Sequence, residues 1–319
     1  MKVVVIGGAG YIGSLIVELL LARGHQVRVY DRLLFGDQAM VSFREHPNFA
    51  MTIGDIRDLA SIVPLVKDTD AVILTAAIVG EQACDADPAE TEAVNLFAPL
   101  AITEACKYYG VNRFVFASTD SVYGIQEGVI TEQAELKAVS LYARLKILME
   151  EELRALSTAD FQPVILRKAT VYGLSHRMRF DLLLNILARF AALHNRINIF
   201  GGDQWRPMVH ARDAAMAYVL AVEADAAKVA GQVFNVGDTS QNYQIGTLGE
   251  LVRKIVPDVE IVTTPEPPDL RDYHVNCDKI KSVLGYQIEH SCEGGIREVY
   301  GAVKRGDFGD TSDAMYYNA

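Results

Sequence analysis

The sequence predicts an α/β fold built on a doubly wound parallel sheet. Over the first half of the chain, short apolar runs alternate with segments whose apolar residues recur at helical spacing. A glycine-rich turn at residues 7–13 follows the first apolar run, and a Ser/Thr-rich stretch at residues 118–121 follows a later one. Such alternation is typical of parallel strands that are joined by helices.

The individual elements follow in chain order. We expect strands at residues 2–6, 26–30, 49–53, 71–75, 113–117 and 162–167, and helices at residues 12–23, 58–66, 93–109 and 141–156. Beyond Gly173 the pattern is less regular, and it predicts a helix at 178–193, a strand at 197–200, a helix at 211–223 and a strand at 233–236.

These elements suggest two associated parts. The first is a sheet domain of residues 1–175, to which residues 207–238 return. The second is a smaller C-terminal lobe of residues 176–206 and 239–308, and residues 309–319 form a surface tail.

Composition excludes several classes of protein. The chain has 319 residues, 50% of them hydrophobic, which is enough to bury a large core. A net charge of −11 argues against a nucleic-acid binder. The four cysteines are widely separated, without CxxC or Cys/His ligand spacing, which favours the reducing cytoplasm and predicts neither disulfides nor a metal site. Glycines interrupt the apolar N-terminus, unlike a signal peptide, and no other segment approaches a membrane span, so we expect no membrane contact.

The glycine-rich turn has the features of a dinucleotide-binding fingerprint, with the variant spacing GxxGxxG. Gly7 permits a tight turn, Gly10 leaves room for a pyrophosphate, and Gly13 lets the following helix pack on its strand. That helix presents free N–H groups and the positive end of its dipole to the phosphates. We expect the other turn residues Tyr11 and Ile12 to contact the dinucleotide as well. The alternative is an ordinary glycine turn of an α/β domain.

The second predicted strand ends in Asp31, which supports the same interpretation. An acidic residue there can accept hydrogen bonds from both ribose hydroxyls of NAD, and it would repel the extra phosphate of NADP. The neighbouring Arg32 leaves some room for NADP, but Asp31 favours NAD as the cofactor.

The candidate catalytic group is Tyr142 with Lys146, which share one face of a predicted helix. Lowering the pKa of a tyrosine from about 10 by about three units requires about 4 kcal/mol. One ammonium at about 4 Å in an intermediate dielectric supplies about that much. Thr119 would hydrogen-bond the reacting hydroxyl. The alternative is an amphipathic surface helix, which is how we interpret the equivalent spacing of Tyr300 and Lys304.

Together these motifs resemble the extended short-chain dehydrogenases/reductases, and within them the NAD-dependent nucleotide-sugar epimerase/dehydratase group. The resemblance covers nearly the whole chain and implies a Rossmann-type sheet domain with a C-terminal substrate-binding lobe. It implies that Thr119, Tyr142 and Lys146 are catalytic. It also implies further cofactor contacts from Asp55, Ile56, Ala76 and Ala77.

The same resemblance assigns the substrate end. Arg206 matches the arginine that grips the substrate diphosphate, and Arg271 resembles a second such contact, with a solvated surface charge as the alternative. Two further stretches are similar to a subgroup of bacterial surface-sugar pathways that includes heptose-nucleotide 4-dehydrogenases: residues 76–80 with Cys84 and Pro88, and residues 169–181. The second of them places four polar residues at the start of the substrate lobe, where the alternative is packing and solvation: His176, Arg177, Arg179 and Asn185.

Departures from the family pattern favour one reaction. Leu74 stands where members often have His, and Thr170 where they often have Asn. We expect Asp120 and Ser121, in the loop after Thr119, to contact the substrate. Ser121 stands where 4,6-dehydratases usually have a glutamate. A serine hydroxyl is too weak a base to remove a proton from carbon unaided.

The predicted function is therefore that of an NAD-dependent epimerase of a nucleoside-diphosphate sugar, acting by transient oxidation at C4 as UDP-glucose 4-epimerases do. Alternatives are a 4-dehydrogenase that releases a 4-keto sugar, a 4,6-dehydratase, and a non-catalytic NAD(H)-sensing protein. The resemblance also implies a homodimer in which the helices at 93–109 and 141–156 pair into a four-helix bundle.

Overall fold

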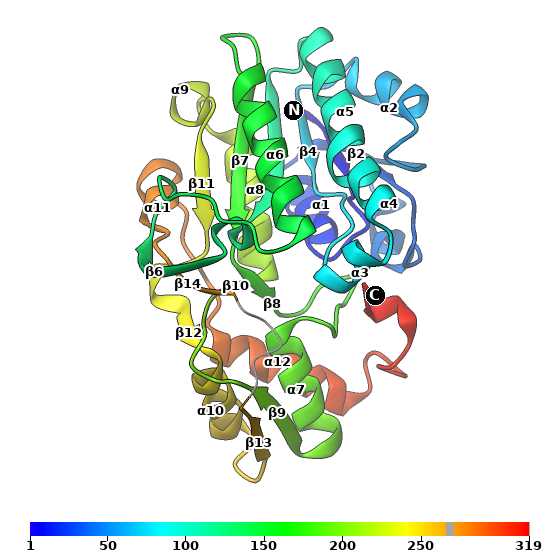
Figure 1. Ribbon diagram of the computed structural model, residues 1–319. Coiled ribbons are helices and arrows are strands. Elements are labelled where there is room, and N and C mark those ends of the chain that lie inside the picture. The colour runs from blue at the N-terminus through cyan, green and yellow to red at the C-terminus, as the bar shows by residue number, and fades with distance from the viewer. Residues whose placement is uncertain (266–270, 319) are drawn as a thin grey trace.

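A seven-stranded sheet forms the centre of the computed structural model, which describes residues 1–265 and 271–318 (Figure 1). Neighbouring strands run parallel, in the order β11-β7-β5-β4-β1-β2-β3. The six strands predicted in the first half are present, and the strand predicted at 233–236 joins the same sheet. The strands are β1 (Lys2–Ile6), β2 (Gln26–Asp31), β3 (Phe49–Ile53), β4 (Ala71–Leu74), β5 (Arg113–Thr119), β7 (Gln162–Lys168) and β11 (Val233–Val236).

Helices cover both faces of this sheet. Val3 and Val5 face one apolar layer, which includes α1 (Gly13–Ala22) and α8 (Ala211–Glu223). Val4 and Ile6 face the other, to which three helices contribute: α2 (Leu59–Val66), α5 (Ala98–Tyr108) and α6 (Leu141–Leu156). Strands covered on both faces are apolar throughout, which explains their continuous runs of Val and Ile. The predicted doubly wound α/β fold is confirmed.

The helix predicted at residues 93–109 is longer and interrupted. It begins with α4 (Pro88–Glu92), continues as a π-helical turn at Ala93–Phe97, and ends as α5. In the turn, the buried amide of Asn95 accepts a hydrogen bond from the N–H of Ile78 and donates one to its carbonyl oxygen, both at 2.8 Å. The turn thereby fixes the loop that follows β4.

Most of the remaining elements lie beyond the carboxyl end of the large sheet, whereas α9 (Ala226–Val229) leads into the amino end of β11 (Figure 1). The described residues form one three-stranded and two two-stranded sheets besides the large one: β12-β10-β8, β13-β9 and β14-β6. Their strands are β6 (Ile125–Ile130), β8 (Thr170–Tyr172), β9 (Arg196–Phe200), β10 (Trp205–His210), β12 (Asn242–Gln244), β13 (Glu260–Thr264) and β14 (Asp272–Val275). The helices are α3 (Glu81–Ala86), α7 (Leu183–His194), α9 (Ala226–Val229), α10 (Ile245–Ile255), α11 (Asp278–Leu284) and α12 (Cys292–Arg305). Residues 266–270 of the predicted C-terminal lobe lie outside the described residues.

Helix α7 starts at Leu183 rather than at residue 178, because residues 173–182 form a loop. Arg179 and Asp181 in this loop pair with each other at 2.6 Å. Tyr300 and Lys304, which have the same spacing as Tyr142 and Lys146, lie on α12 and do not border the cavity described below.

Residues 309–318, predicted as a surface tail, are exposed or half-buried apart from Thr311, and they are tied to the loop before α7. The ring of Phe180, which is buried, packs against Phe308 and Tyr316 at centroid distances of 5.2 and 5.3 Å. The N–H of Phe180 also donates to the carbonyl oxygen of Tyr316 at 3.0 Å. Two aromatic side chains therefore anchor this acidic segment over an apolar ring, and bring it to the loop before α7.

The four cysteines are buried and carry free thiols. Burial raises the pKa of Cys84 to about 11 and that of Cys106 to about 12, which makes these thiols unreactive at neutral pH. Within residues 1–265 and 271–318, none of the helices has the length and apolar character required to cross a membrane.

Candidate functional site

The glycine-rich turn joins β1 to α1 at the carboxyl edge of the sheet. Gly7 has a φ of +90°, and a Cβ there would collide with the backbone of Ala76. A Cβ on Gly13 would collide with the carbonyl oxygen of Gly7. At Gly10 an added Cβ would approach only that carbonyl oxygen, at 3.3 Å, and the residue borders a cavity. The turn thus presents bare backbone to the cavity, which fits the pyrophosphate of a dinucleotide.

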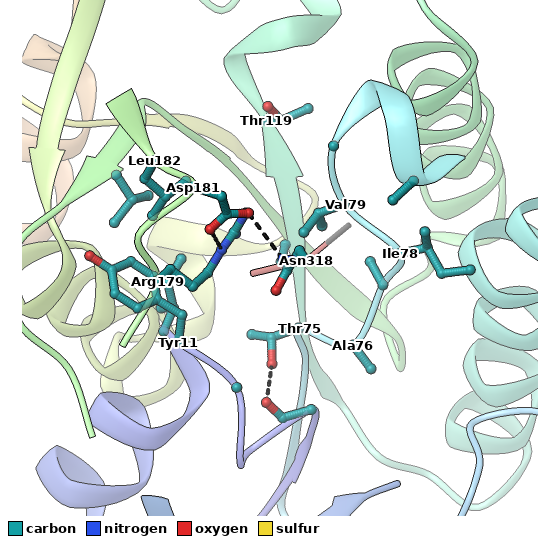
Figure 2. Close-up of a pocket in the computed structure, with 18 of the residues that line it drawn as sticks. Tyr11, Thr75, Ala76, Ile78, Val79, Thr119, Arg179, Asp181, Leu182 and Asn318 are labelled. Atoms are coloured by element: carbon teal, nitrogen blue, oxygen red, sulfur yellow. Dashed lines mark hydrogen bonds and ion pairs between the residues drawn. The ribbon is translucent and has the colours of Figure 1, made fainter. Parts of the chain in front are cut away.

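The cavity measures about 920 Å³ and extends from this turn to the smaller part of the molecule. In Figure 2, Tyr11 of the turn, Arg179 and Asp181 of the loop before α7, and Val79 of the loop after β4 surround it. Most of the predicted cofactor and substrate residues border it: Gly7, Gly10, Tyr11, Ile12, Gly13, Asp31, Arg32, Ile56, Ala76, Ala77, Thr119, Asp120, Ser121, Tyr142, Arg179, Arg206 and Arg271. Asp55, Lys146 and Asn185 are not part of the cavity wall.

Asp55 turns away from the cavity toward Arg57. Both carboxylate oxygens accept hydrogen bonds from that guanidinium, at 2.8 Å each. Hydrogen bonding to Arg57 lowers the pKa of Asp55 to about 2. Its neighbour Ile56 supplies the apolar surface at this end of the cavity.

Asp31 ends β2 with its carboxylate toward the glycine turn. It accepts hydrogen bonds from the N–H groups of Ala9, at 3.0 Å, and Leu33, at 2.8 Å. Burial raises its pKa, against the effect of these bonds. The carboxylate therefore ties the turn to the loop after β2 and still borders the cavity, where ribose hydroxyls are expected.

Thr119, at the carboxyl end of β5, and Tyr142, on α6, both border the cavity, whereas Lys146 is not part of its wall. The ammonium of Lys146 donates to the carbonyl oxygen of Ala117 at 2.9 Å and lies 5.7 Å from the centroid of the Tyr142 ring. Burial, and secondarily the cation of Lys168, lowers the pKa of Lys146 to about 7. The ammonium is thus only partly charged near neutrality.

The pKa of Tyr142 differs from the expectation. Burial is the largest influence and raises it above its ordinary value, whereas the cations of Arg179 and Arg271 lower it. Attraction to Lys146 alone would lower this pKa, but removing a phenolate from water is costly and favours the neutral form.

Asp120 follows Thr119 in a 3₁₀ turn (Asp120–Tyr123) and is 3% exposed. One carboxylate oxygen accepts a hydrogen bond from the hydroxyl of Tyr273 at 3.2 Å; the other has no hydrogen-bond partner among the described residues. Burial raises its pKa to about 6, although the nearby cation of Arg271 opposes this.

Asp120 should therefore make stability depend on pH. Its folded-state pKa of about 6 exceeds the ordinary value of 3.8, so the unfolded chain ionises first and the folded state loses relative stability as pH rises. The free energy of unfolding of Asp120→Asn should rise by about 2 kcal/mol relative to that of the wild type as the pH increases from about 4 to about 8. Urea unfolding of both proteins across this range measures the difference, and a constant difference would contradict the raised pKa.

Two arginines approach this carboxylate from elements far apart in the chain. Arg206, on β10, is 3% exposed and donates to the carbonyl oxygens of Trp205, at 2.8 Å, and Arg271. The guanidinium of Arg271 donates to the hydroxyl of Ser121 at 3.0 Å. Pairing of β14 with β6 delivers Arg271 to this position, so both predicted diphosphate contacts lie at one end of the cavity.

Asn185 is fully engaged within the protein. Its carbonyl oxygen accepts from the N–H of Gly173 at 2.9 Å, and its amide nitrogen donates to the hydroxyl of Tyr11 and the carbonyl oxygen of Arg179. The residue is 1% exposed. In this geometry it fastens the loop before α7 to the glycine turn.

Lys168 is a cavity residue without a role predicted from the sequence. This residue is the register partner of Thr119 across β7 and β5, and it borders the cavity. Its ammonium donates to the carbonyl oxygen of Ser118 at 2.9 Å, and burial lowers its pKa to about 8. Its place at the end of a predicted strand beside that of Thr119 was the available signal.

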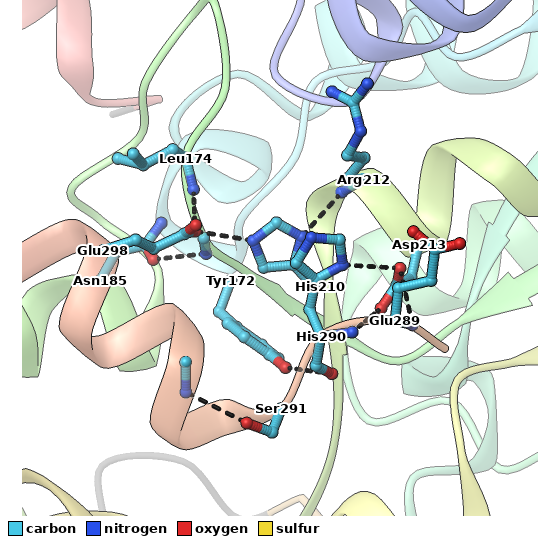
Figure 3. A network of polar contacts seen from close by, with 12 residues as sticks. Tyr172, Leu174, Asn185, His210, Arg212, Asp213, Glu289, His290, Ser291 and Glu298 are labelled. Carbon is cyan, nitrogen blue, oxygen red and sulfur yellow. Dashed lines mark hydrogen bonds and ion pairs between the residues drawn. The ribbon is translucent and has the colours of Figure 1, made fainter. Parts of the chain in front are cut away.

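A polar network supports the loop before α7 from below (Figure 3). The imidazoles of His210 and His290 stack with centroids 4.0 Å apart. His210 forms a hydrogen bond with Glu298 at 2.7 Å, and His290 forms one with Asp213 at 2.8 Å. Glu298 also accepts a hydrogen bond from the N–H of Leu174 at 2.8 Å. The network links β10, α8 and α12 to the loop.

Comparison with known proteins agrees with this geometry. A family model described as the NAD dependent epimerase/dehydratase family matches residues 3–237. The UDP-glucose 4-epimerase of Corynebacterium glutamicum is 28% identical over 311 residues, covering 91% of this chain and 92% of that protein.

Solved structures agree as well. The UDP-glucose 4-epimerase of Thermotoga maritima, solved with UDP-glucose, has a TM-score of 0.84 and 26% identity, covering 96% of this chain and 99% of that chain. The UDP-glucuronic acid 4-epimerase of Bacillus cereus, in complex with UDP-glucuronic acid and NAD, has a TM-score of 0.85, 26% identity and the same coverage. The resemblance inferred from the motifs is confirmed: this chain belongs to the NAD dependent epimerase/dehydratase family.

Proposed function

We propose that the chain is an NAD-dependent epimerase of a nucleoside-diphosphate sugar, which inverts C4 by transient oxidation. One observation carries the proposal: a single cavity joins the glycine turn, Thr119 and Tyr142, and the two arginines Arg206 and Arg271. The similarity to the epimerases named above supports it.

The chain's own residues would handle the proton and the position of the sugar. NAD, when bound, supplies the acceptor and donor of hydride at C4. Tyr142 takes the proton of the 4-hydroxyl and later returns it, and Thr119 orients that hydroxyl. Since burial holds the phenol of Tyr142 neutral, the phenolate needs local positive charge, to which Lys146, Arg179 and Arg271 contribute.

The arginines at the far end would hold the diphosphate while the keto sugar turns. Guanidinium groups match phosphate oxygens geometrically and remain charged when buried. Anchoring at the diphosphate lets either face of C4 meet the same hydride position, which inversion requires.

Incubation with UDP-, GDP-, CDP- and dTDP-sugars, followed by NMR, tests the proposal. We expect one sugar nucleotide to interconvert with its C4 epimer without net reduction of NAD. A keto sugar that accumulates with stoichiometric NADH would instead identify a 4-dehydrogenase.

One observation supports a second candidate, a 4,6-dehydratase. Asp120 holds a buried carboxyl with a pKa of about 6 in the cavity wall, where it could protonate a departing hydroxyl. Ser121 supplies no matching base for C5, so the epimerase is the better-supported function. A 4-keto-6-deoxy product in the same NMR experiment would reverse this order.

We also propose that the protein works as a cytoplasmic homodimer that pairs through α5 and α6. Phe97, in the turn before α5, and Leu148, on α6, are 59% and 44% exposed, so this region offers large apolar side chains to a partner. Light scattering at micromolar concentration should give about twice the chain mass of 35.1 kDa. Leu148→Glu should produce monomers, whereas Leu193→Glu, at a residue 46% exposed on α7, should not. A monomeric wild type would refute the dimer.

A further inference from the structure

Arg177 is a buried cation whose side chain the mechanism above does not use. It lies in the loop of residues 173–182 and is 5% exposed. Its guanidinium carbon lies 3.7 Å from the centroid of the Phe35 ring, in the loop that follows β2. Within the described residues, neither Nε nor one of the terminal nitrogens, Nη2, has a hydrogen-bond acceptor.

Such an arrangement is costly for the protein alone. Buried N–H groups without acceptors lose their hydration, and the penalty is larger for a charged group. The acidic neighbours Asp31 and Asp181 attract the cation, but among the described residues neither accepts a hydrogen bond from Nε or Nη2. Asp31 accepts hydrogen bonds from the backbone of Ala9 and Leu33, and Asp181 is paired with Arg179. Arg177 remains charged near neutrality, because burial lowers its pKa only to about 10.

The loop places this cation at the dinucleotide end of the cavity. The hydroxyl of Tyr11 donates to the carbonyl oxygen of Gly173 at 2.6 Å, and the hydroxyls of Ser14 and Ser175 lie 3.1 Å apart. Both contacts fix the loop over the glycine turn. Arg177 and Phe35 border the cavity there, on the side of Asp31.

Phe35 is itself held in place by the backbone. Leu33, two residues earlier, has a φ of +55°, which a leucine seldom adopts. Its N–H donates to Asp31 at 2.8 Å. The carboxylate that should meet the ribose thus also shapes the loop that carries the aromatic partner of Arg177.

We propose that Arg177 binds a phosphate group of the dinucleotide, by closing over the glycine turn from the loop before α7. The planar guanidinium offers two parallel donors to phosphate oxygens, and Phe35 supports its face. The phosphate is the pyrophosphate that NAD and NADP share, not the additional ribose phosphate of NADP. This inference depends on the NAD site of the family and not on the reaction at C4.

Binding measurements on the full-length chain test the assignment. Arg177→Met keeps the apolar contact with Phe35 and removes the donors, and Arg177→Lys keeps only a point charge. Arg253→Met, on the exposed side of α10, is the matched control. Titration calorimetry on protein freed of nucleotide gives the Kd for NAD+, NADP+ and UDP.

We expect Arg177→Met to weaken the binding of NAD+ about 10- to 100-fold. The Kd of Arg177→Lys should lie between those of wild type and Arg177→Met, and that of Arg253→Met should be unchanged. The affinity for NADP+ should fall by the same factor, and the Kd for UDP should stay within about twofold of the wild-type value. A loss confined to NADP+ would assign the ribose phosphate instead, and a loss confined to UDP would assign the substrate diphosphate. Either result overturns the proposal.

Thermal unfolding separates ligand binding from a structural role. Without nucleotide, Arg177→Met should melt no lower than wild type, because two buried donors without acceptors, Nε and Nη2, have been removed. The stabilisation of the variant by added NAD+ should be smaller than that of wild type. A lower melting temperature with an unchanged Kd for NAD+ would mean that Arg177 is structural. These readouts need no turnover, so a failed epimerase assay would not affect them.

Discussion

Tyr142→Phe is expected to lower turnover by about 10²- to 10⁴-fold while NAD stays bound. The change removes one oxygen from a ring that is 8% exposed, and the ring itself keeps its packing against neighbouring side chains. Only the proton transfer to and from the 4-hydroxyl should be lost. Steady-state kinetics with the sugar nucleotide identified by NMR, together with the bound NAD content of the purified variant, measure both effects.

The chain offers a matched control at its second Tyr-x-x-x-Lys spacing. Tyr300 lies on α12 with Lys304 at 5.8 Å from its ring centroid, and neither borders the cavity. Tyr300→Phe should retain wild-type turnover. Retained turnover in Tyr142→Phe would instead remove the tyrosine from the mechanism.

Glu150→Ala should cause the largest loss of stability, about 3–5 kcal/mol. Glu150, on α6, pairs with Arg167, on β7, at 2.6 Å, and each side chain is 1% exposed. Removing the carboxylate leaves a buried guanidinium without its counterion. Urea denaturation monitored by circular dichroism gives the free energy of unfolding.

Two further variants check that the loss comes from the unpaired charge. Glu151→Gln changes the adjacent, exposed glutamate of the same helix and should be nearly neutral. Combining Glu150→Met with Arg167→Met should recover much of the loss, because both charges leave the core together. A cost below about 1 kcal/mol for Glu150→Ala would contradict this account.

The central sheet could be predicted closely because strands that are buried on both faces consist of consecutive apolar residues. The predicted bounds of β1 and β3, and those of α6 at 141–156, match the structure. The bounds predicted for the helix at 93–109 were less accurate, because the π-helical turn that contains Asn95 does not follow the apolar period of an α-helix.

Positions within the sheet and its turns follow from local spacing, whereas side-chain directions depend on long-range pairing. The glycine turn and Tyr142 occupy positions that local spacing specifies. Asp55 bonds Arg57, and Asn185 bonds main chain, because side-chain direction depends on partners that spacing does not reveal. Lys168 reaches the cavity through its register with Thr119, which only the folded sheet defines.

The course of the last residues matters for handling the protein. Asn318 borders the cavity, and its N–H donates to Asp181 at 3.2 Å. An affinity tag on the carboxyl side of Asn318 would follow a residue of the cavity wall, while a tag before Met1 would start at the amino end of the sheet (Figure 1). Expression vectors for enzymatic work should therefore carry the tag at the N-terminus.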